Sequence, residues 1–448
     1  GRRRRADDLH LRVAVASPLG RGRAVAVVLV VAALPIAAAG SASARPRAPS
    51  IAVLPAGTTT IVEDAAWSWF EDERAQLSAD GSALYTSAVA GPQAQQHDPG
   101  TVLLSEVRLA TGSRRMVELG HAESDDHNSA SIWEAPTGEL TTSWSRHTVD
   151  SAIRTQRRRT DGSWLRLPSV QVSGTTAYSS LISSTGAAGQ DLLYDFYRGE
   201  RFDPSVLVSA DVGRTWSSLG RVLRDPADSA SGRPYVQYAN DGHGRIDLIA
   251  TETHPRDSQT SVYHGYIEQG QVFSSTGTLL GPLGSTLPVT ALTLVWAPSG
   301  EERAWVSGIE HDPATGQPVI AFSVRHSVTD HRYWYGRWDG AAWQTAEVAY
   351  AGRALYAAEA DYTGLAAVDP IDPNHLVIST DAHPASGLPL LSSTDGLRHW
   401  ELWDGRRAGN GSWSWTALTT DSTMDNLRPV LTSAGGAQAM LWMRGRYT

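Results

Sequence analysis

The chain has 448 residues, of which 38 are basic and 47 acidic, and its formal net charge is −9. Every basic residue is arginine, and cysteine is absent. Without lysine, Schiff-base chemistry and lysine-containing phosphate loops are excluded. Without cysteine, neither disulfides nor thiolate metal sites can form, so the fold must rely on a large apolar core, for which a chain of this length suffices.

The first 44 residues have the pattern of an export signal. Seven arginines precede an apolar run from Ala24 to Ala39, and Ala42-Ser43-Ala44 supplies a small-residue cleavage pattern. The run contains Pro35 and is shorter than the roughly 20 residues that a membrane span needs. We therefore expect a signal peptide over residues 1–44, a mature chain beginning near Arg45, and secretion to the extracellular space or the periplasm. A lipid or uncleaved anchor is the alternative.

The mature chain is more acidic than the whole. Removing residues 1–44 takes away seven arginines and two acidic residues, which leaves 31 basic and 45 acidic residues and a formal charge near −14. Such a charge argues against nucleic acid as a partner. No second apolar stretch is long enough to cross a bilayer, so we expect no membrane association after cleavage, and a monomer.

The region after residue 44 is typical of an all-β fold, with short alternating segments broken by Gly, Asp, Asn and Ser. Clear examples are Ala83–Ala88, Thr101–Leu109, Leu140–Arg146 and Pro318–Val324. Turn signals recur at intervals of roughly 50 to 70 residues, as expected for repeated four-stranded sheets. They are centred on Gly112, Gly162, Gly213, Gly270, Gly340 and Gly411.

This spacing predicts a single β-propeller over residues 45–448. About 400 residues at about 55 per blade give seven four-stranded blades, within the usual range for propellers. We expect Ile51–Ala56 or nearby strands to close the ring against Ala437–Met443.

One repeat element is specific. Residues 209–216, Ser-Ala-Asp-Val-Gly-Arg-Thr-Trp, fit the Asp-box pattern S-x-D-x-G-x-T-W, in which the Asp caps a hairpin turn and the Trp packs into the blade. Weaker copies occur at 160–164, 338–343 and 393–400. These residues indicate the architecture and carry no chemistry of their own.

Several further motifs together resemble the BNR-repeat family that includes the propeller-fold ulvan lyases and related polysaccharide lyases. The motifs are Trp67-Ser68-Trp69-Phe70-Glu71-Asp72-Glu73-Arg74-Ala75, Asp125-Asp126-His127-Asn128, Ser145-Arg146-His147, Arg233-Pro234-Tyr235-Val236-Gln237-Tyr238, Thr253-His254-Pro255, Tyr263-His264-Gly265-Tyr266, Asp369-Pro370, Asp372-Pro373-Asn374, Trp413-Ser414-Trp415, Asn426-Leu427-Arg428-Pro429 and Leu441-Trp442-Met443. The resemblance spans almost the whole mature chain and implies a secreted enzyme that cleaves a uronic-acid-containing polysaccharide, with or without sulfate groups, by β-elimination. Glu73, where relatives tend to have Pro, and Ser129-Ala130 depart from the pattern and mark a divergent member.

Two histidines can be placed by spacing. Residues 128–133 and 140–146 form short β-like runs on either side of the turn signal Ala135-Pro136-Thr137-Gly138, which predicts a hairpin. In such a hairpin the residue numbers of each cross-strand pair add up to the same value, here about 273. The numbers of His127 and His147 add up to 274. The two side chains are therefore expected side by side at the open end, as cross-strand neighbours. The alternative without a function is a pair of ordinary surface or hydrogen-bonded histidines.

β-Elimination at a uronic acid needs a base, an acid and a group that holds the carboxylate. Histidine suits proton transfer near neutral pH, tyrosine can serve as the acid or, when ionised, as the base, and an arginine fork matches a carboxylate. We assign catalysis to His127 and His147. The resemblance adds Tyr178 and Tyr235 as catalytic residues, and Arg198, Asn128 and Arg233 as substrate-binding residues, with packing roles as the alternative.

Two further patterns leave alternatives open. Asp125 and Asp126 could be a carboxylate pair for glycoside hydrolysis, but adjacent acids in a turn more often cap it, and one of them could orient His127. The resemblance implies a structural metal ion near His254 and His264, although the absence of cysteine puts that site in doubt. No cofactor is needed for the elimination itself.

Two other functions compete with the lyase. A sialidase-like glycoside hydrolase shares Asp boxes and propellers, but no F-R-I-P or Y-R-I-P motif occurs near the first blade. A non-catalytic carbohydrate-binding propeller could use some of the sixteen Trp residues for stacking on sugars, although most of them lie at blade-repeat positions. The sequence leaves open the polysaccharide, the endo or exo mode, and which histidine or tyrosine is the base.

Overall fold

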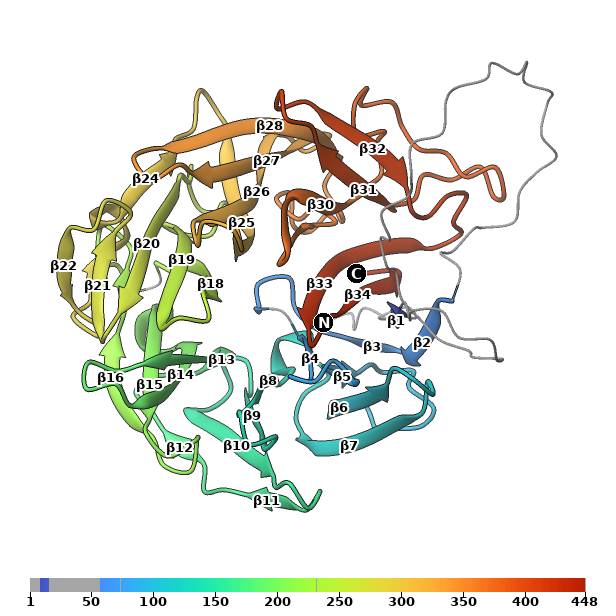
Figure 1. Cartoon of the computed structure of the whole chain (residues 1–448). Helices are drawn as coiled ribbons and strands as arrows, with labels where there is room; N and C mark the ends of the chain where they lie inside the picture. The colour runs from blue at the N-terminus through green and yellow to red at the C-terminus, as the bar shows by residue number, and fades with distance from the viewer. Residues whose placement is uncertain (1–8, 16–56, 73, 231, 448) are drawn as a thin grey trace.

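The computed structural model describes residues 9–15, 57–72, 74–230 and 232–447. Sheets of antiparallel strands follow one another around a common centre, and helical structure in these residues is confined to three 3-10 turns (Figure 1). The prediction of an all-β propeller is confirmed. The four strand segments taken as examples from the sequence are all strands, at 83–90, 101–108, 140–145 and 318–327.

The described residues form seven sheets of four or more strands, and the count of seven blades stays a prediction. In chain order, the first three sheets are β3 Ala65–Ala66, β4 Ala75–Leu77, β5 Ala83–Ala90, β6 Thr101–Arg108 and β7 Arg114–His121; β8 Ser131–Glu134, β9 Leu140–Ser145, β10 Ala152–Arg158, β11 Trp164–Arg166 and β12 Val170–Gln171; and β13 Ala177–Thr185, β14 Asp191–Arg198, β15 Pro204–Ser209 and β16 Ser217–Arg221. The next three are β18 Tyr235–Asn240, β19 Arg245–Thr251, β20 Val262–Glu268, β21 Gln271–Ser274, β22 Leu279–Pro282 and β24 Thr293–Trp296; β25 Arg303–His311, β26 Pro318–Ser327, β27 Asp330–Trp338 and β28 Trp343–Gly352; and β29 Ala366–Asp369, β30 Asp372–Thr380, β31 Glu401–Arg407 and β32 Trp413–Ala417.

The seventh sheet joins the two ends of the chain. It consists of β33 Asp425–Ala434, β34 Ala437–Gly445, β1 Leu9–Val15 and β2 Thr59–Val62, in the order β2-β1-β34-β33. β1 belongs to the segment predicted to be a signal peptide, so its pairing with β34 was not expected. Ile51–Ala56, predicted to help close the ring, lie outside the described residues, and closure by that segment stays a prediction.

Short elements connect the sheets. A two-stranded parallel pair links neighbouring blades, and the 3-10 turns lie in the connections. These elements are β17 Leu223–Arg224 with β23 Leu287–Pro288, η1 Asp126–Asn128, η2 Glu200–Phe202 and η3 Val289–Ala291.

Apolar side chains between neighbouring sheets form the core. In one cluster, Tyr85 and Leu104 of the first sheet pack with Leu140 and Trp144 of the next. Nine of the sixteen Trp side chains are buried and no other is fully exposed. Because burial of large aromatic side chains contributes much of a core's stability, blade packing accounts for the Trp content better than sugar stacking does.

The Asp boxes are turn caps. Asp211 accepts hydrogen bonds from the backbone of Arg214 at 3.0 Å and Thr215 at 2.8 Å, and from the Thr215 hydroxyl at 2.6 Å. In the weaker copies, Asp161 and Asp339 likewise accept from backbone N–H groups two residues ahead. The structural role predicted for these residues is confirmed.

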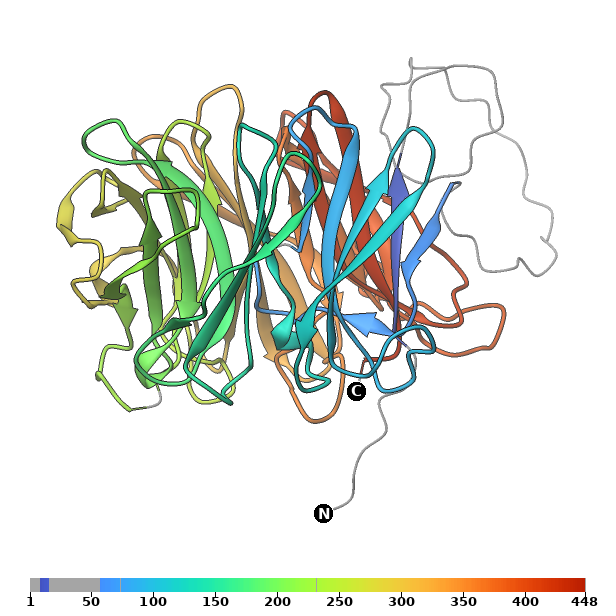
Figure 2. The ribbon, with the colours of Figure 1, turned by 90° about the horizontal axis from the view of Figure 1, so that it is seen from below.

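The strands run between the two faces of a disc, and the C-terminus lies at the lower face in Figure 2. No helix in the described part of the chain is long and apolar enough to cross a bilayer. The connections η1, β9 to β10, and β14 to η2 come together at one face, which places His127, His147 and Arg198 there.

Candidate functional site

The predicted histidine hairpin is present. β8 pairs with β9 through Ser131↔Ser143 and Ile132↔Thr142, so paired numbers sum to 274, the register that places His127 opposite His147. The Ala135–Gly138 turn is closed by a hydrogen bond from the Gly138 N–H to the Ala135 carbonyl at 2.8 Å. Beyond β8 the chain turns into η1, so His127 lies on a 3-10 turn rather than on the strand itself.

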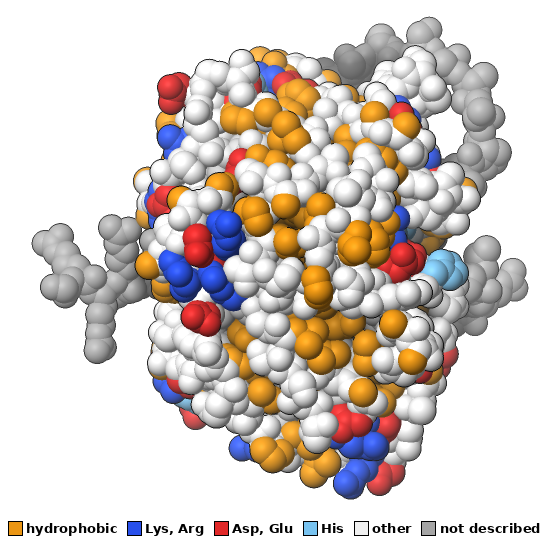
Figure 3. Space-filling model, turned by 90° about the vertical axis from the view of Figure 1, so that its left-hand side faces the viewer, with side chains coloured by type: hydrophobic (Ala, Val, Ile, Leu, Met, Phe, Trp, Pro, Cys, Tyr) orange, Lys and Arg blue, Asp and Glu red, His pale blue; other side chains and the backbone are white. Residues whose placement is uncertain are grey.

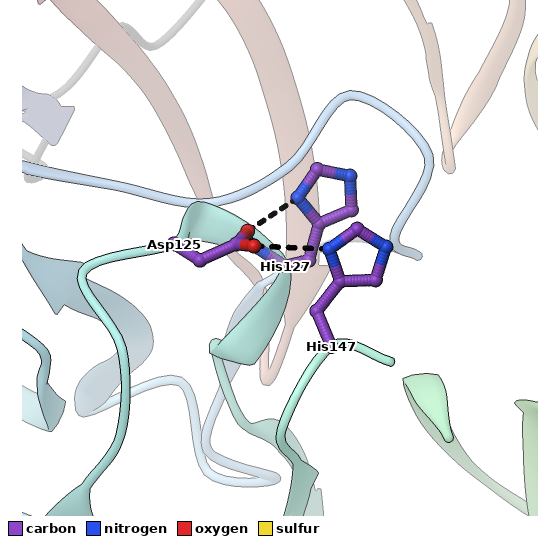
Figure 4. Close-up of side chains that lie close together, drawn as sticks. All are labelled: Asp125, His127 and His147. Carbon is purple, nitrogen blue, oxygen red and sulfur yellow. Dashed lines mark hydrogen bonds and ion pairs between the residues drawn. The ribbon is translucent and has the colours of Figure 1, made fainter. Parts of the chain in front are cut away.

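The two imidazole rings are stacked, with centroids 4.0 Å apart and 6° between their planes. The Asp125 carboxylate bridges them: Oδ1 lies 2.6 Å from Nδ1 of His127, and Oδ2 lies 2.9 Å from Nδ1 of His147 (Figure 4). Asp125 Oδ1 also accepts from the backbone N–H of His127 at 3.0 Å, which caps η1. Both Nε2 atoms face away from the carboxylate and remain for other partners (Figure 4).

The surroundings separate the protonation states of the two rings. Burial disfavours the charged form of His127, but Asp126 and Asp125 outweigh burial and raise the pKa of His127 to about 10. Burial lowers the pKa of His147, and the charges of His127 and Arg198 lower it further against the opposing effect of Asp125. Burial also opposes ionisation of Asp125, yet its hydrogen bonds to both histidines hold the pKa of this carboxyl well below its usual range. At neutral pH the unit is therefore a carboxylate, an imidazolium and a neutral imidazole.

Arg198, at the end of β14, contacts His147 directly. Its NH2 group lies 2.9 Å from Nε2 of His147, and because a guanidinium can only donate, this ring nitrogen must accept. His147 consequently carries its proton on Nδ1, which donates to Asp125. Within the described residues no carboxylate forms an ion pair with Arg198, so its charge is available to an anion that enters the site.

Two tyrosines lie on Arg198. The guanidinium is 4.4 Å from the ring centre of Tyr178, and its NH1 group lies 3.5 Å from the Tyr178 hydroxyl and 3.4 Å from that of Tyr235. Burial raises the pKa of Tyr178 well above its usual value, with Arg198 only partly opposing the shift, so this phenol stays protonated at neutral pH. The backbone of Tyr178 has φ of 61°, which an L-residue rarely adopts and which marks a constrained position.

A buried ion pair supports the backbone on both sides of the site. Arg74 and Glu71 have fully buried side chains, with a closest N–O distance of 3.2 Å. Arg74 also donates to the Ser129 hydroxyl at 3.3 Å and to the Ser179 carbonyl at 2.7 Å. Ser129 follows η1 and Ser179 follows Tyr178, so the guanidinium of Arg74 holds both of these segments of the backbone.

The structure does not bring Asn128 and Arg233 to the site in the predicted way. Asn128 is fully buried: its Oδ1 accepts from the His147 backbone N–H at 2.6 Å, and its Nδ2 donates to the Glu123 carbonyl at 3.0 Å. A substrate could not reach this amide, so Asn128 positions His147 instead of binding substrate. Arg233 forms an ion pair with Asp257, and no contact between Arg233 and the histidine pair is recorded in the described residues.

The two predicted metal residues have different partners. His254 is buried against Phe70, Tyr235 and Trp305, and burial, with the charges of Arg256 and Arg233, lowers its pKa to about 3. His264 hydrogen-bonds Asp247 and Ser275, both at 2.8 Å. In the described residues the two histidines share no hydrogen-bond partner and no ring contact.

The residues around His264 do not fit the metal ion that the motif resemblance implies. The Asp247 carboxylate that a metal would need already accepts hydrogen bonds from Arg245 and contacts His264 and His311. Among the described residues, the group of three ligating side chains close enough for a metal is Asp125, His127 and His147. There the ring protons on Nδ1 account for the short contacts, and an ion would have to displace both of them.

Tyr447, near the end of the chain, was not predicted. Its hydroxyl donates to Asp126 Oδ2 at 2.7 Å, while Asp126 Oδ1 lies 2.7 Å from Nδ1 of His127. Asp125 and Asp126 thus approach the same ring nitrogen rather than facing each other across a substrate-sized gap, which opposes their use as a glycoside-hydrolase pair. No local signal pointed to Tyr447, because 321 positions separate it from Asp126.

Comparison with known families decides the relationship. The sequence profile described as "BNR repeat-containing family member" matches residues 85–351, more than half of the chain. The chain belongs to this BNR repeat-containing family. The family resemblance recognised in the motifs is thereby confirmed.

Solved structures similar to this BNR-family protein include two polysaccharide lyases. One is described as a PL25 ulvan lyase bound to -[GlcA(1-4)Rha3S]-, with 13% identity, a TM-score of 0.57, and coverage of 85% of this chain and 89% of that one. The other is polysaccharide lyase Uly1, with 12% identity, a TM-score of 0.50, and coverage of 84% and 90%. At these identities the likeness shows the fold alone. A search of curated protein sequences gave no match.

Proposed function

We propose that this BNR-family protein is a secreted polysaccharide lyase that cleaves an acidic, uronate-containing polysaccharide by β-elimination. The observation that carries the proposal is the Asp125-bridged histidine pair, in which a neutral His147 and a cationic His127 lie next to the unpaired charge of Arg198. The likeness to lyase structures supports a lyase-like propeller, and the site supplies the reason to prefer elimination.

The three groups fit the three requirements of the reaction. Arg198 would bind the uronate carboxylate, which gives its guanidinium the anionic partner that the described residues do not provide. When Arg198 turns from His147 to the carboxylate, Nε2 of His147 would be free to take the proton at C5. The electrons form the C4–C5 double bond as the C4–oxygen bond breaks.

The departing oxygen must receive a proton. Two protonated groups flank His147, the imidazolium of His127 and the phenol of Tyr178, whose ring centres lie 4.0 and 6.0 Å from the His147 ring. His127 is held protonated by two carboxylates, and its Nε2 faces away from both of them, so we assign the acid to His127 and a supporting hydrogen bond to Tyr178. No step of this scheme uses a cofactor.

The test is a screen of the purified protein against ulvan, glycosaminoglycans, rhamnogalacturonan and alginate, with detection of the ultraviolet absorbance of the unsaturated product. The expected result is absorbance that grows with time on at least one of these polymers and is lost when the uronates of that polymer are reduced to neutral sugars. New reducing ends without absorbance would instead indicate hydrolysis. Binding without cleavage would indicate a carbohydrate-binding propeller.

A further inference from the structure

A second cationic feature lies on the outer part of the first two sheets. A cleft of about 430 Å³ is lined by arginines of β6, β7 and β10 and by the turn after β10. Its charged lining residues are Arg108, Arg114, Arg115, Arg158, Arg159, Glu106 and Asp161. Five arginines against two carboxylates give a formal charge of +3, in a chain whose net charge is −9.

This arginine cleft lies at the other face of the disc from the histidine pair. β9 leads toward His147 at its C-terminal end, and β10 returns from there, so Arg158 pairs with Leu140 at the far end of the hairpin. β6 likewise begins at Thr101, paired with His121 on the site side, and ends at Arg108. Seven steps along such a strand span about 23 Å, so one sugar residue cannot contact both places.

The two carboxylates leave several of the arginine charges uncompensated. Glu106 is shared between Arg108 at 2.6 Å and Arg158 at 2.7 Å. Asp161 accepts from the backbone and hydroxyl of Ser163 as a turn cap. Arg115 and Arg159 are exposed, and neither side chain forms an ion pair with another described residue.

On another side of the molecule the charges balance more closely. The side of the molecule that carries β16, β21 and β22 shows arginines next to acidic side chains in small mixed clusters (Figure 3). Arg221, at the end of β16, contacts both Asp203 and Asp228. The excess of arginine in the cleft thus contrasts with this side of the molecule and with the negative net charge of the chain.

We propose that the arginine cleft is a second binding site for the sulfated or carboxylated groups of an anionic polysaccharide. Guanidinium forks match the planar or tetrahedral oxygens of such groups, and a volume of about 430 Å³ lies within the range of ligand-binding pockets. The cleft is inferred from its arginines alone, whereas the choice of polysaccharide over other polyanions rests on the proposed function. A site on the far face would hold the polymer near the enzyme without taking part in cleavage.

The test measures the binding of immobilised dextran sulfate, with uncharged dextran as the reference, in an Arg198→Ala background that removes the cation of the histidine site. The double variant Arg115→Ala/Arg159→Ala should bind about tenfold more weakly, since exposed ion pairs contribute up to about a factor of five each. Arg214→Ala is the matched control: Arg214 is an exposed arginine in the Asp-box turn between β15 and β16, and its guanidinium forms no ion pair in the described part of the chain. It should bind within twofold of the background protein.

Three outcomes would overturn the proposal. The double variant could bind dextran sulfate as tightly as the background protein, uncharged dextran could bind equally well, or a DNA duplex could bind more tightly than the sulfated polymer. Failure of the proposed function is a separate result, because absence of elimination in the polymer screen leaves this binding measurement unaffected. In a protein with Arg198 intact, the double variant should keep the wild-type cleavage rate on short fragments, which cannot span both faces.

Discussion

Two stacked imidazoles, His127 and His147, share one carboxylate and yet have pKa values displaced in opposite directions. The difference arises from their second partners. His127 receives Asp126 as an additional acid, whereas His147 receives the guanidinium of Arg198 on its other nitrogen. Such a pair holds a proton donor and a proton acceptor within one small unit, which is what an elimination requires.

The first prediction concerns the removal of each ring. Because general acid or base groups typically contribute about 10² to 10⁴-fold, His127→Ala and His147→Ala should each lower turnover by that order while the protein remains folded. The measurement compares the rate of formation of unsaturated product with thermal melting for both variants. Near-normal turnover in both would remove the catalytic assignment. A large loss of stability with little specific loss of rate would identify structural histidines.

The second prediction is a pH profile with separated limbs. His147 must be neutral, and its pKa is lowered below 6.5, so activity should fall only at acidic pH, as this ring gains a proton. His127 must be protonated, and its pKa is raised to about 10, so activity should fall again near that pH. Asp126→Asn removes a charge that raises the pKa of His127, and the alkaline limb should therefore move to lower pH. An unmoved alkaline limb would contradict the role of Asp126.

The sequence predicted the hairpin but not the whole site. Turn residues 135–138 and the alternation on both sides fix the register, so local information was enough to pair His127 with His147. Tyr447 reaches Asp126 only because the last sheet returns the chain end to this face, a contact that no local pattern encodes.

Two assignments taken from motif similarity depend on packing that the sequence does not show. Motif similarity identified Asn128 and His264 as functional residues, but it could not reveal that Asn128 is completely buried or that the carboxylate beside His264 is already engaged by Arg245. Burial and hydrogen-bond saturation depend on the packing of strands that are distant in sequence. The all-β propeller, by contrast, could be predicted because its turns repeat along the chain.

The third prediction tests the buried support of the site. Arg74→Met leaves Glu71 without its counter-ion in the core, and breaking a buried pair in this way costs about 3 to 5 kcal/mol. Chemical denaturation should show that loss in the free energy of unfolding. The double variant Arg74→Met/Glu71→Leu should recover part of it, since no charge is then left buried. Equal stability of the single variant and wild type would show that the pair contributes nothing.

The fourth prediction concerns the N-terminal segment. We expect export with cleavage near Arg45, although the structure pairs Leu9–Val15 with β34. N-terminal sequencing of the exported protein should give a start near Arg45, and that protein should melt in a single cooperative transition. An exported chain that retains residues 9–15, or a cleaved chain that no longer folds, would show that β1 is a structural strand and that the signal prediction is wrong.

The last prediction separates substrate binding from proton transfer at Arg198. A fork that holds the uronate carboxylate through two hydrogen bonds cannot be replaced by a single ammonium, so Arg198→Lys should raise KM more than it lowers kcat. Arg198→Ala should lower kcat/KM further. It should also allow the pKa of His147 to rise, because the nearby positive charge that lowers it is gone, and the acidic limb of the profile should move to higher pH. Carboxyl-reduced polymer provides the matched control: if Arg198 binds that carboxylate, wild type and Arg198→Ala should bind the reduced polymer equally weakly. An Arg198→Lys variant with unchanged KM, or a variant that discriminates between native and reduced polymer as wild type does, would assign this arginine to packing against Tyr178 and Tyr235 instead.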